Sequence, residues 1–179
     1  MQNFLLMKPS KYAEELSMQF GYSETLFIDQ DFVIIEGENR KKVLQEAHKF
    51  QDKIVIYRAK SEEMLRFVLE KTPVNIVINQ EHIHPRDSLH YLRSGLDQVL
   101  CKIAADKGKT MGFAFSDLAK AKDQGKLFGR AMANIGLCEK YRVKAVFLTF
   151  FQNGKEFRSA HDLQQFWQVL QQGNRNIYK

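Results

Sequence analysis

Residues 54–78 read IVIYRAKSEEMLRFVLEKTPVNIVI. Both ends of this stretch, Ile54 to Tyr57 and Val74 to Ile78, are runs of β-branched and aromatic residues that are apolar almost throughout. Such runs are typical of strands covered on both faces. Between them, Met64 and Val68 have the spacing of one helix face. The stretch therefore predicts a strand, a helix and a second strand, which is the repeating unit of a parallel sheet.

The same alternation continues in both directions. Further strands are predicted at Phe4 to Met7, Thr25 to Ile28, Phe32 to Ile35, Thr110 to Phe115 and Ala145 to Phe151. Apolar helix stripes are predicted at Leu44, Ala47 and Phe50, at Met64, Phe67 and Val68, and at Leu96, Val99, Leu100 and Ile103. Ser61 and Ser159 stand where helices should begin, and Gly108 stands where a helix should end with a positive φ. No linker interrupts the pattern, so we expect one α/β domain over residues 1–179.

Composition restricts the class of protein. The chain has 179 residues, of which 44% are hydrophobic and 27% are charged, as in an ordinary globular domain. The net charge is +6 and is spread along the chain, which makes an anionic partner plausible, although many basic proteins bind no polyanion. Cys101 and Cys138 are expected to be buried thiols in a reducing cytoplasm. The apolar start, Met1 to Met7, is too short for a signal peptide or a membrane span, so we expect no membrane contact and a cytoplasmic location.

One long polar connection, Asn79 to Ser94, follows a predicted strand and carries three of the five histidines. Ligands of α/β folds bind at the carboxyl ends of strands, so this connection is the first place to look for function. His82 and His84 would point the same way on an extended backbone, and Glu81, Asp87, His90 or the more distant Asp29 could complete a metal shell. A hydrolase would need further ligands from other strand ends, which offer few.

Other catalytic signatures are missing from the sequence. There is no Gly-x-Ser-x-Gly elbow, no phosphate-binding glycine motif and no obvious histidine partner for either cysteine. The Gly-Lys-Thr at residues 108–110 precedes a predicted strand and reads as a helix-ending turn. We therefore expect no catalytic residue in this chain.

The positions of the basic residues indicate a possible function more clearly than any catalytic motif does. Five of them accompany the long connection and the helix after it, and three others follow predicted strands. Arginine suits phosphate through its bidentate fork, so these side chains could meet on one RNA-binding face, whereas the alternative for each is a solvated surface position. The candidates are Arg86, Arg93, Lys102, Lys107, Lys109, Arg58, Arg158 and His161.

Three ordered motifs resemble a known family. Residues 93–118, RSGLDQVLCKIAADKGKTMGFAFSDL, are similar to the signature of the archaeal and eukaryotic thirty-kilodalton (p30) subunit of ribonuclease P, which is archaeal protein component 3. Residues 137–143, LCEKYRV, resemble the Glu-Lys-Tyr-x-Val of that family. Residues 157–166, FRSAHDLQQF, resemble its Arg-x-Pro-Arg-Asp-Leu. The chain departs from the family at Gln98, Ser116, Asp117 and Ala160-His161, which removes positive charge.

The resemblance implies a TIM-barrel-like (β/α) fold of the PHP type, related to metal-dependent phosphoesterases but without their metal ligands. The chain stops where relatives add another strand and helix, so a shortened or incomplete barrel is expected. The implied function is a non-catalytic subunit that supports RNA-catalysed removal of 5′ leaders from precursor tRNA, with Mg²⁺ used by the RNA. The implied partners are ribonuclease P RNA, precursor tRNA, a small ferredoxin-like subunit and other ribonuclease P proteins. The alternative is a small phosphoesterase of the same lineage that uses His82, His84 and Asp29.

Overall fold

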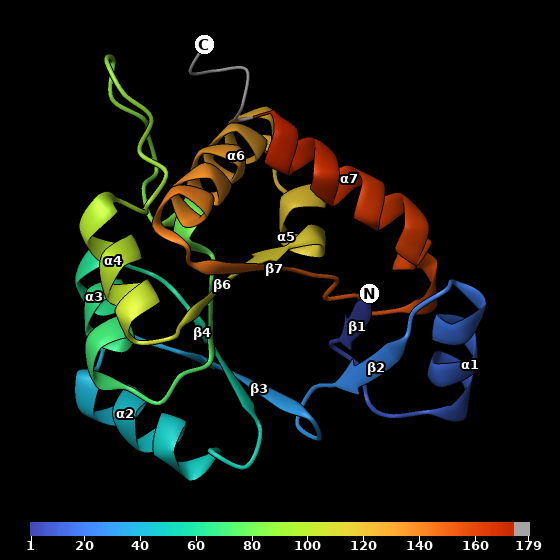
Figure 1. Cartoon of the computed structure of the whole chain (residues 1–179). Helices are drawn as coiled ribbons and strands as arrows, with labels where there is room; N and C mark the ends of the chain where they lie inside the picture. The colour runs from blue at the N-terminus through green and yellow to red at the C-terminus, as the bar shows by residue number, and fades with distance from the viewer. Residues whose placement is uncertain (174–179) are drawn as a thin grey trace.

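The computed structural model describes residues 1–173, in which parallel strands alternate with helices (Figure 1). The strands are β1 (Gln2–Leu5), β2 (Glu24–Phe27), β3 (Phe32–Glu36), β4 (Ile54–Arg58), β5 (Ile76–Ile78), β6 (Thr110–Ala114) and β7 (Lys144–Leu148). The helices are α1 (Lys11–Gln19), α2 (Arg40–Lys49), α3 (Glu62–Lys71), α4 (Gln98–Asp106), α5 (Phe115–Ala119), α6 (Gln124–Tyr141) and α7 (Ala160–Gln172). Two 3₁₀ turns, Gln80–His82 and Gly154–Glu156, complete the order.

The seven strands are arranged as a ring. They form a two-stranded sheet, β1–β2, and a five-stranded sheet, β3–β4–β5–β6–β7. Single bridges join the two sheets, one between Leu5 and Phe151 and the other between Ile28 and Phe32. Strand order around the ring follows the chain, and the helices lie outside it (Figure 1). The fold is thus a mixed α/β structure with parallel strands, consistent with a TIM-barrel-like arrangement of seven strands.

The core has two parts, as the ring requires. One cluster receives side chains from every strand and fills the ring: Phe4, Leu26, Phe32, Ile56, Ile76, Ile78, Ala114, Leu148 and Phe150. The other lies between the strands and the helices. Because both faces of each strand are buried, the strands read as continuous apolar runs. This double burial is why residues 54–78 alone predicted a parallel sheet.

Local signals from the sequence are largely confirmed. The hydroxyl groups of Ser61 and Ser159 accept hydrogen bonds from Met64 N and Asp162 N and begin α3 and α7. Gly108 follows α4 with a φ of +62°. Cys101 and Cys138 are buried free thiols. The stripe of α4 was predicted wrongly at one position, since Val99 is exposed and the helix buries Leu100, Cys101 and Ala104.

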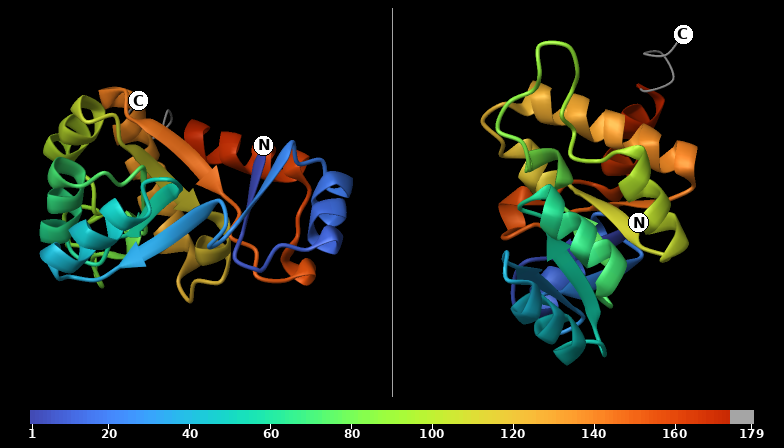
Figure 2. Two further views of the ribbon diagram at one scale, coloured as in Figure 1. Left: turned by 90° about the horizontal axis from the view of Figure 1, so that it is seen from below. Right: turned by 90° about the vertical axis from the view of Figure 1, so that its left-hand side faces the viewer.

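Three strands differ from the prediction by two residues or more at one end. The first spans Gln2–Leu5 and not Phe4 to Met7, β5 spans only Ile76–Ile78, and β7 spans Lys144–Leu148 and not Ala145 to Phe151. The chain passes from β2 to β3 without a helix. The connection between β5 and α4 projects from the body of the molecule (Figure 2). No helix within residues 1–173 has the length and apolar character needed to cross a membrane.

Candidate functional site

The long connection after β5 is held at its base by α6. Arg130 is only 1% exposed, and its Nη1 donates to the carbonyl oxygens of Glu81 at 2.9 Å and His84 at 2.6 Å. Its Nε and Nη2 donate to Oδ1 of Asp87 at 2.9 and 2.7 Å. Asn134, one turn along α6, donates to the carbonyl of Ser94 at 2.8 Å. The base of the connection is therefore fixed, whereas Leu89 at its tip is 92% exposed.

The backbone that joins His82 to His84 is not extended, since Ile83 between them has helical dihedral angles (φ −56°, ψ −39°), so that part of the sequence interpretation was wrong. Asn79 takes a left-handed φ of 69°, and a 3₁₀ turn follows that contains His82. Nε2 of His84 lies 2.6 Å from Oε1 of Glu62. Asp29 follows β2 and is not brought together with them. Among residues 1–173, no three His, Cys, Asp or Glu side chains are placed to hold a metal ion.

The carboxyl ends of the strands meet at one edge of the ring, which we call the carboxyl edge. Its charged side chains pair with one another. Nη1 of Arg58 lies 2.9 Å from Oδ2 of Asp117, and Nε of Arg58 lies 3.6 Å from Oε1 of Glu36, which is an ion-pair distance too long for a hydrogen bond. Lys60 also pairs with Glu36, at 3.0 Å. This edge therefore offers paired charges and not a basic surface.

A buried carboxyl group lies under the same edge. Glu81 is 1% exposed, and burial raises the pKa of its side chain to about 7, with Asp117 adding to the rise. Its Oε2 has no hydrogen-bond partner in the structure. Burial likewise lowers the pKa of His82, because the protonated ring is poorly solvated there. Both shifts favour the uncharged form, as expected of groups removed from water.

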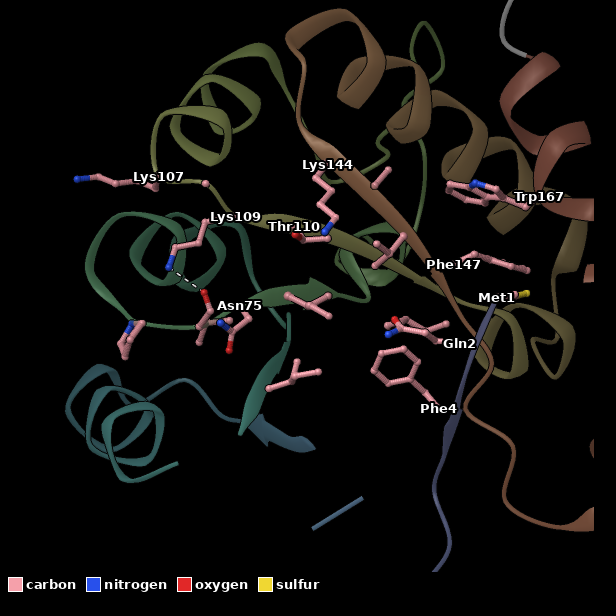
Figure 3. A pocket seen from close by; sticks show the side chains of 18 of the residues that line it. Met1, Gln2, Phe4, Asn75, Lys107, Lys109, Thr110, Lys144, Phe147 and Trp167 are labelled. Carbon is pink, nitrogen blue, oxygen red and sulfur yellow. Dashed lines mark hydrogen bonds between the residues drawn. The ribbon is translucent and has the colours of Figure 1, made fainter. Parts of the chain in front are cut away.

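The opposite edge of the ring, where the strands begin, is basic and hollow; we call it the amino edge. A cavity of about 710 Å³ opens there between the starts of β1, β4, β5, β6 and β7. Lys107, Lys109 and Lys144 are among the residues that line it, and no Asp or Glu does (Figure 3). Nζ of Lys109 donates to the carbonyl oxygens of Thr72 and Val74 at 2.7 and 2.8 Å. Lys107 ends α4 and is exposed.

The eight basic candidates from the sequence do not gather on one face. Arg58 ends β4 at the carboxyl edge, whereas Lys107 and Lys109 lie at the amino edge. Arg86 and Arg93 belong to the projecting connection, and Lys102 is exposed on α4. Arg158 and His161 lie beside α1, where Tyr22 Oη donates to the Arg158 carbonyl at 2.8 Å. Contact between any of these residues and RNA stays a prediction.

The first sequence motif has structural roles that the fold explains. The carbonyl of Ser94 accepts the bond from Asn134, and Asp97 Oδ1 caps α4 through Leu100 N at 2.7 Å. Gly95 has a φ of +90°, and a Cβ at that position would lie 1.9 Å from the carbonyl oxygen of Gln80. Leu96 is buried. These four residues join the long connection to α4 and to the end of β5.

Two important residues, Arg130 and Lys144, were missed at the level of sequence, and a third, Glu81, was considered only as a possible metal ligand. Arg130 reads as one more cation on an amphipathic helix, and nothing around Glu81 in the sequence indicates that it is buried. Lys144 stands immediately before an apolar run, as do Lys53 and Lys109. This repeated lysine before a strand is the one signal that could have indicated a basic amino edge.

With the ring, its two edges and its anchored connection defined, comparisons place the chain among known folds. No protein-family model and no curated protein sequence matches it. Two crystal structures share the architecture: an amidohydrolase, at 13% identity with a TM-score of 0.51, and an uncharacterized protein, at 11% identity with a TM-score of 0.50. Alignments with them cover 91% and 89% of this chain and 42% of each of those chains. They show a shared fold class.

A more extensive likeness is to a chain in the cryo-EM structure of archaeal ribonuclease P with mature tRNA. The TM-score is 0.78 and the sequence identity is 18%. The alignment covers 96% of this chain and 83% of that chain. Nearly the whole of this chain therefore has the fold of that chain.

Proposed function

We propose that this protein is an RNA-binding, non-catalytic subunit of a ribonuclease P ribonucleoprotein. The observation that carries the proposal is the structural likeness over 96% of the chain to a chain of archaeal ribonuclease P. The three ordered motifs between residues 93 and 166, which resemble the p30 family, support the same assignment independently. In this role the protein supports removal of 5′ leaders from precursor tRNA by the RNA, and the RNA uses the Mg²⁺.

The proposal includes a barrel of the PHP type that has no metal centre of its own. The described residues do not fit such a centre, because His84 pairs with Glu62, Arg58 pairs with Asp117, and no three potential ligands converge. The proposed partners are ribonuclease P RNA, precursor tRNA, a small ferredoxin-like subunit and other ribonuclease P proteins. The proposed location is the cytoplasm.

The test is co-purification of the tagged chain from its source cells, followed by sequencing of the bound RNA. Enrichment of ribonuclease P RNA and of the other ribonuclease P proteins is the expected result. Recovery of the chain without that RNA would overturn the proposal. Purified chain alone, incubated with precursor tRNA and Mg²⁺, should show no cleavage; robust cleavage would contradict the non-catalytic role.

Metal analysis separates the proposal from the phosphoesterase alternative. We expect only background Zn and Mn in chain purified without chelator, and the double change His82→Ala with His84→Ala should leave reconstituted activity within a few-fold. A stoichiometric metal that is lost on this double change would favour the phosphoesterase, since a hydrolytic site retains its ion through purification.

A further inference from the structure

The cavity at the amino edge follows from how the ring closes. β1 and β7 are joined near their carboxyl ends, where Leu5 bridges Phe151 and Leu6 N donates to Phe151 O at 2.9 Å. No ladder pairs the amino end of β1 with that of β7 in the described chain, and residues Gln2 and Lys144 both line the cavity. The interior of the ring is therefore open at this edge, and Phe4 and Leu148 of the interior cluster form part of its wall.

Strand register directs a lysine into this opening. Ile76, Thr110 and Lys144 are register partners on the adjacent strands β5, β6 and β7. Register partners on neighbouring strands present their side chains to the same face of a sheet. Ile76 belongs to the cluster inside the ring, so Thr110 and Lys144 face the same interior. Figure 3 shows the side chain of Lys144 directed from β7 toward Thr110 on the neighbouring strand.

The cavity has two other lysines, and they differ in how far their charge is already used by the protein. Lys109 uses two of its three N–H donors on backbone carbonyl oxygens, and burial together with Lys107 lowers its pKa. Lys107 is the C-cap residue of α4, and a cation at this end of a helix is favoured by the helix dipole. Lys144 begins a strand, so helix capping does not explain it. In residues 1–173, neither Lys107 nor Lys144 is paired with a carboxylate.

We propose that this cavity binds a nucleotide, with its base against the apolar wall and its phosphate at Lys144. The volume of about 710 Å³ is within the usual range of small-ligand pockets, about 300–1,000 Å³. The base would contact Phe4 and Leu148. The amide nitrogen Nδ2 of Asn75 and the hydroxyl of Thr110, which also line the cavity, are suited to the polar edge of a heterocycle, whereas Oδ1 of Asn75 already accepts a hydrogen bond from Val55 N at 2.8 Å.

Two other ligand classes fit the cavity less well. Inorganic phosphate would leave the apolar wall uncovered. A fatty acid would place its chain against Asn75, Thr110 and Gln164, whose polar groups would then lose water without gaining a partner. The nucleotide could be free or part of single-stranded RNA. The RNA source rests on the proposed function, whereas the nucleotide chemistry does not.

The only tryptophan of the chain, Trp167, lines this cavity and stacks on Phe147 with ring centroids 5.2 Å apart. Its fluorescence therefore reports occupancy directly. The full chain is titrated separately with adenosine and uridine 5′-monophosphates, a short single-stranded oligouridylate, inorganic phosphate and palmitate. A saturable change with the nucleotides, absent with phosphate and palmitate, supports the proposal. RNA is the source if the oligonucleotide binds at least about tenfold more tightly than a monophosphate, and comparable affinities indicate a free nucleotide.

Variants locate the site. Lys144→Ala should weaken nucleotide binding by about tenfold or more, as loss of a charge-assisted hydrogen bond requires. Lys144→Arg should retain most of the affinity, and Lys41→Ala, an exposed lysine on α2 that does not line the cavity, should change nothing. Circular dichroism and the thermal transition of each variant show whether it is folded.

Several outcomes would overturn the proposal. These are the absence of any saturable change with nucleotides up to millimolar concentration, a response to palmitate alone, or equal losses for Lys144→Ala and Lys41→Ala. The proposed function can fail separately. Binding of nucleotides by a chain that does not co-purify with ribonuclease P RNA would support the cavity and reject the subunit role. If the Lys144→Ala variant instead assembled normally with ribonuclease P RNA, and neither this variant nor the wild type gave a fluorescence response to nucleotides, the cavity proposal would fail and the subunit role would stand.

Discussion

Arg130 and Asp87 join helix α6 to the long connection through two hydrogen bonds to one carboxylate oxygen. Nε and Nη2 of Arg130 lie 2.9 and 2.7 Å from Oδ1 of Asp87. The side chain of Arg130 is 1% exposed and that of Asp87 is 26% exposed, so the cation is the buried partner. Since Nη1 also donates to the carbonyl oxygens of Glu81 and His84, this one side chain holds three residues at the base of the connection.

Replacing Arg130 should therefore cost much of the stability of this protein. Arg130→Ala leaves the carbonyl oxygens of Glu81 and His84 without this donor, at about 1–3 kcal/mol for each buried group left unsatisfied, whereas Asp87 keeps the hydrogen bond from Arg93 N at 2.9 Å. For a chain of this length, a loss of about 3 kcal/mol lowers the Tm by roughly 6–12 °C. Thermal denaturation followed by circular dichroism measures the change.

The matched control for this prediction is Arg86→Ala. Arg86 is an exposed arginine of the same connection. Its loss should change the free energy of unfolding by no more than about 0.5 kcal/mol, as is usual for surface positions. Equal Tm values for the two variants would show that Arg130 does not anchor the connection.

Glu81 predicts a pH dependence of stability. The folded chain keeps a proton on this buried carboxyl up to about pH 7, whereas the unfolded chain loses it near the ordinary value of 4.5. Between these values the folded state binds more protons, so the free energy of unfolding falls as the pH rises. Glu81→Gln removes the titratable group and with it this decrease of the free energy of unfolding with pH. The variant should match the wild type near pH 4.5 and exceed it progressively above, by up to about 3 kcal/mol near pH 8.

Urea denaturation at half-unit intervals from pH 4.5 to pH 8 tests this dependence. Glu14→Gln, which changes an exposed carboxylate of α1, serves as the control and should give a profile parallel to that of the wild type. If the Glu81→Gln profile also ran parallel to the wild type, the carboxyl would not hold its proton in the folded state.

The fold was largely predictable because strands that are buried on both faces consist of continuous runs of apolar residues. The strand starting at Gln2 shows where that rule fails. Asn3 is polar but completely buried, because its Nδ2 donates to Ser17 Oγ and its Oδ1 accepts from Thr149 Oγ1. A polar residue whose partners lie 14 and 146 positions away gives no local signal. The sequence therefore placed this strand two residues too late.

The candidate site was less predictable because it depends on which edge of the ring each residue reaches. The sequence directed attention to the polar connection at the carboxyl edge, where the charges in fact pair with one another, as Arg58 does with Asp117. The hollow lies at the amino edge and arises from the way β1 and β7 meet. That closure joins residues far apart in sequence, so no motif around Lys144 could reveal it.

Gly95 should tolerate no side chain. Its φ of +90° disfavours other residues, and a Cβ would lie 1.9 Å from the carbonyl oxygen of Gln80. Gly95→Ala should thus force the long connection away from the end of β5, at a cost of about 3 kcal/mol or more. Chemical denaturation gives the value.

Gly129, within α6, is the control for this change, because a Cβ there meets nothing within 4 Å. Gly129→Ala should leave stability unchanged or raise it by about 0.4–1 kcal/mol through helix propensity and reduced entropy of the unfolded chain. A Gly95→Ala variant as stable as Gly129→Ala would mean that the close approach of Gln80 and Gly95 is dispensable.

The last prediction concerns RNA affinity and rests on the proposed function. Lys107 and Arg158 both match basic positions of the family motifs, and both are exposed. If they neutralise phosphates, each contact contributes about 0.9 to the slope of log affinity against log salt concentration, treating the RNA as a duplex. The double change Lys107→Ala with Arg158→Ala should therefore weaken binding of the assembled protein complex to RNA and flatten that slope by up to about two contacts, with the Tm within a few degrees.

The control pair is Lys41 and Lys42, which lie exposed in the first turn of α2 and remove the same charge when changed to alanine. Filter binding at several salt concentrations compares the two double variants. If the RNA were attracted only diffusely to a basic protein, the two double variants would lose the same affinity, because each lost charge would have the same effect wherever it lies. A located contact makes the Lys107 and Arg158 pair cost more at every salt concentration. The gap should narrow as salt rises, since release of each counterion into a more concentrated salt solution gains less free energy.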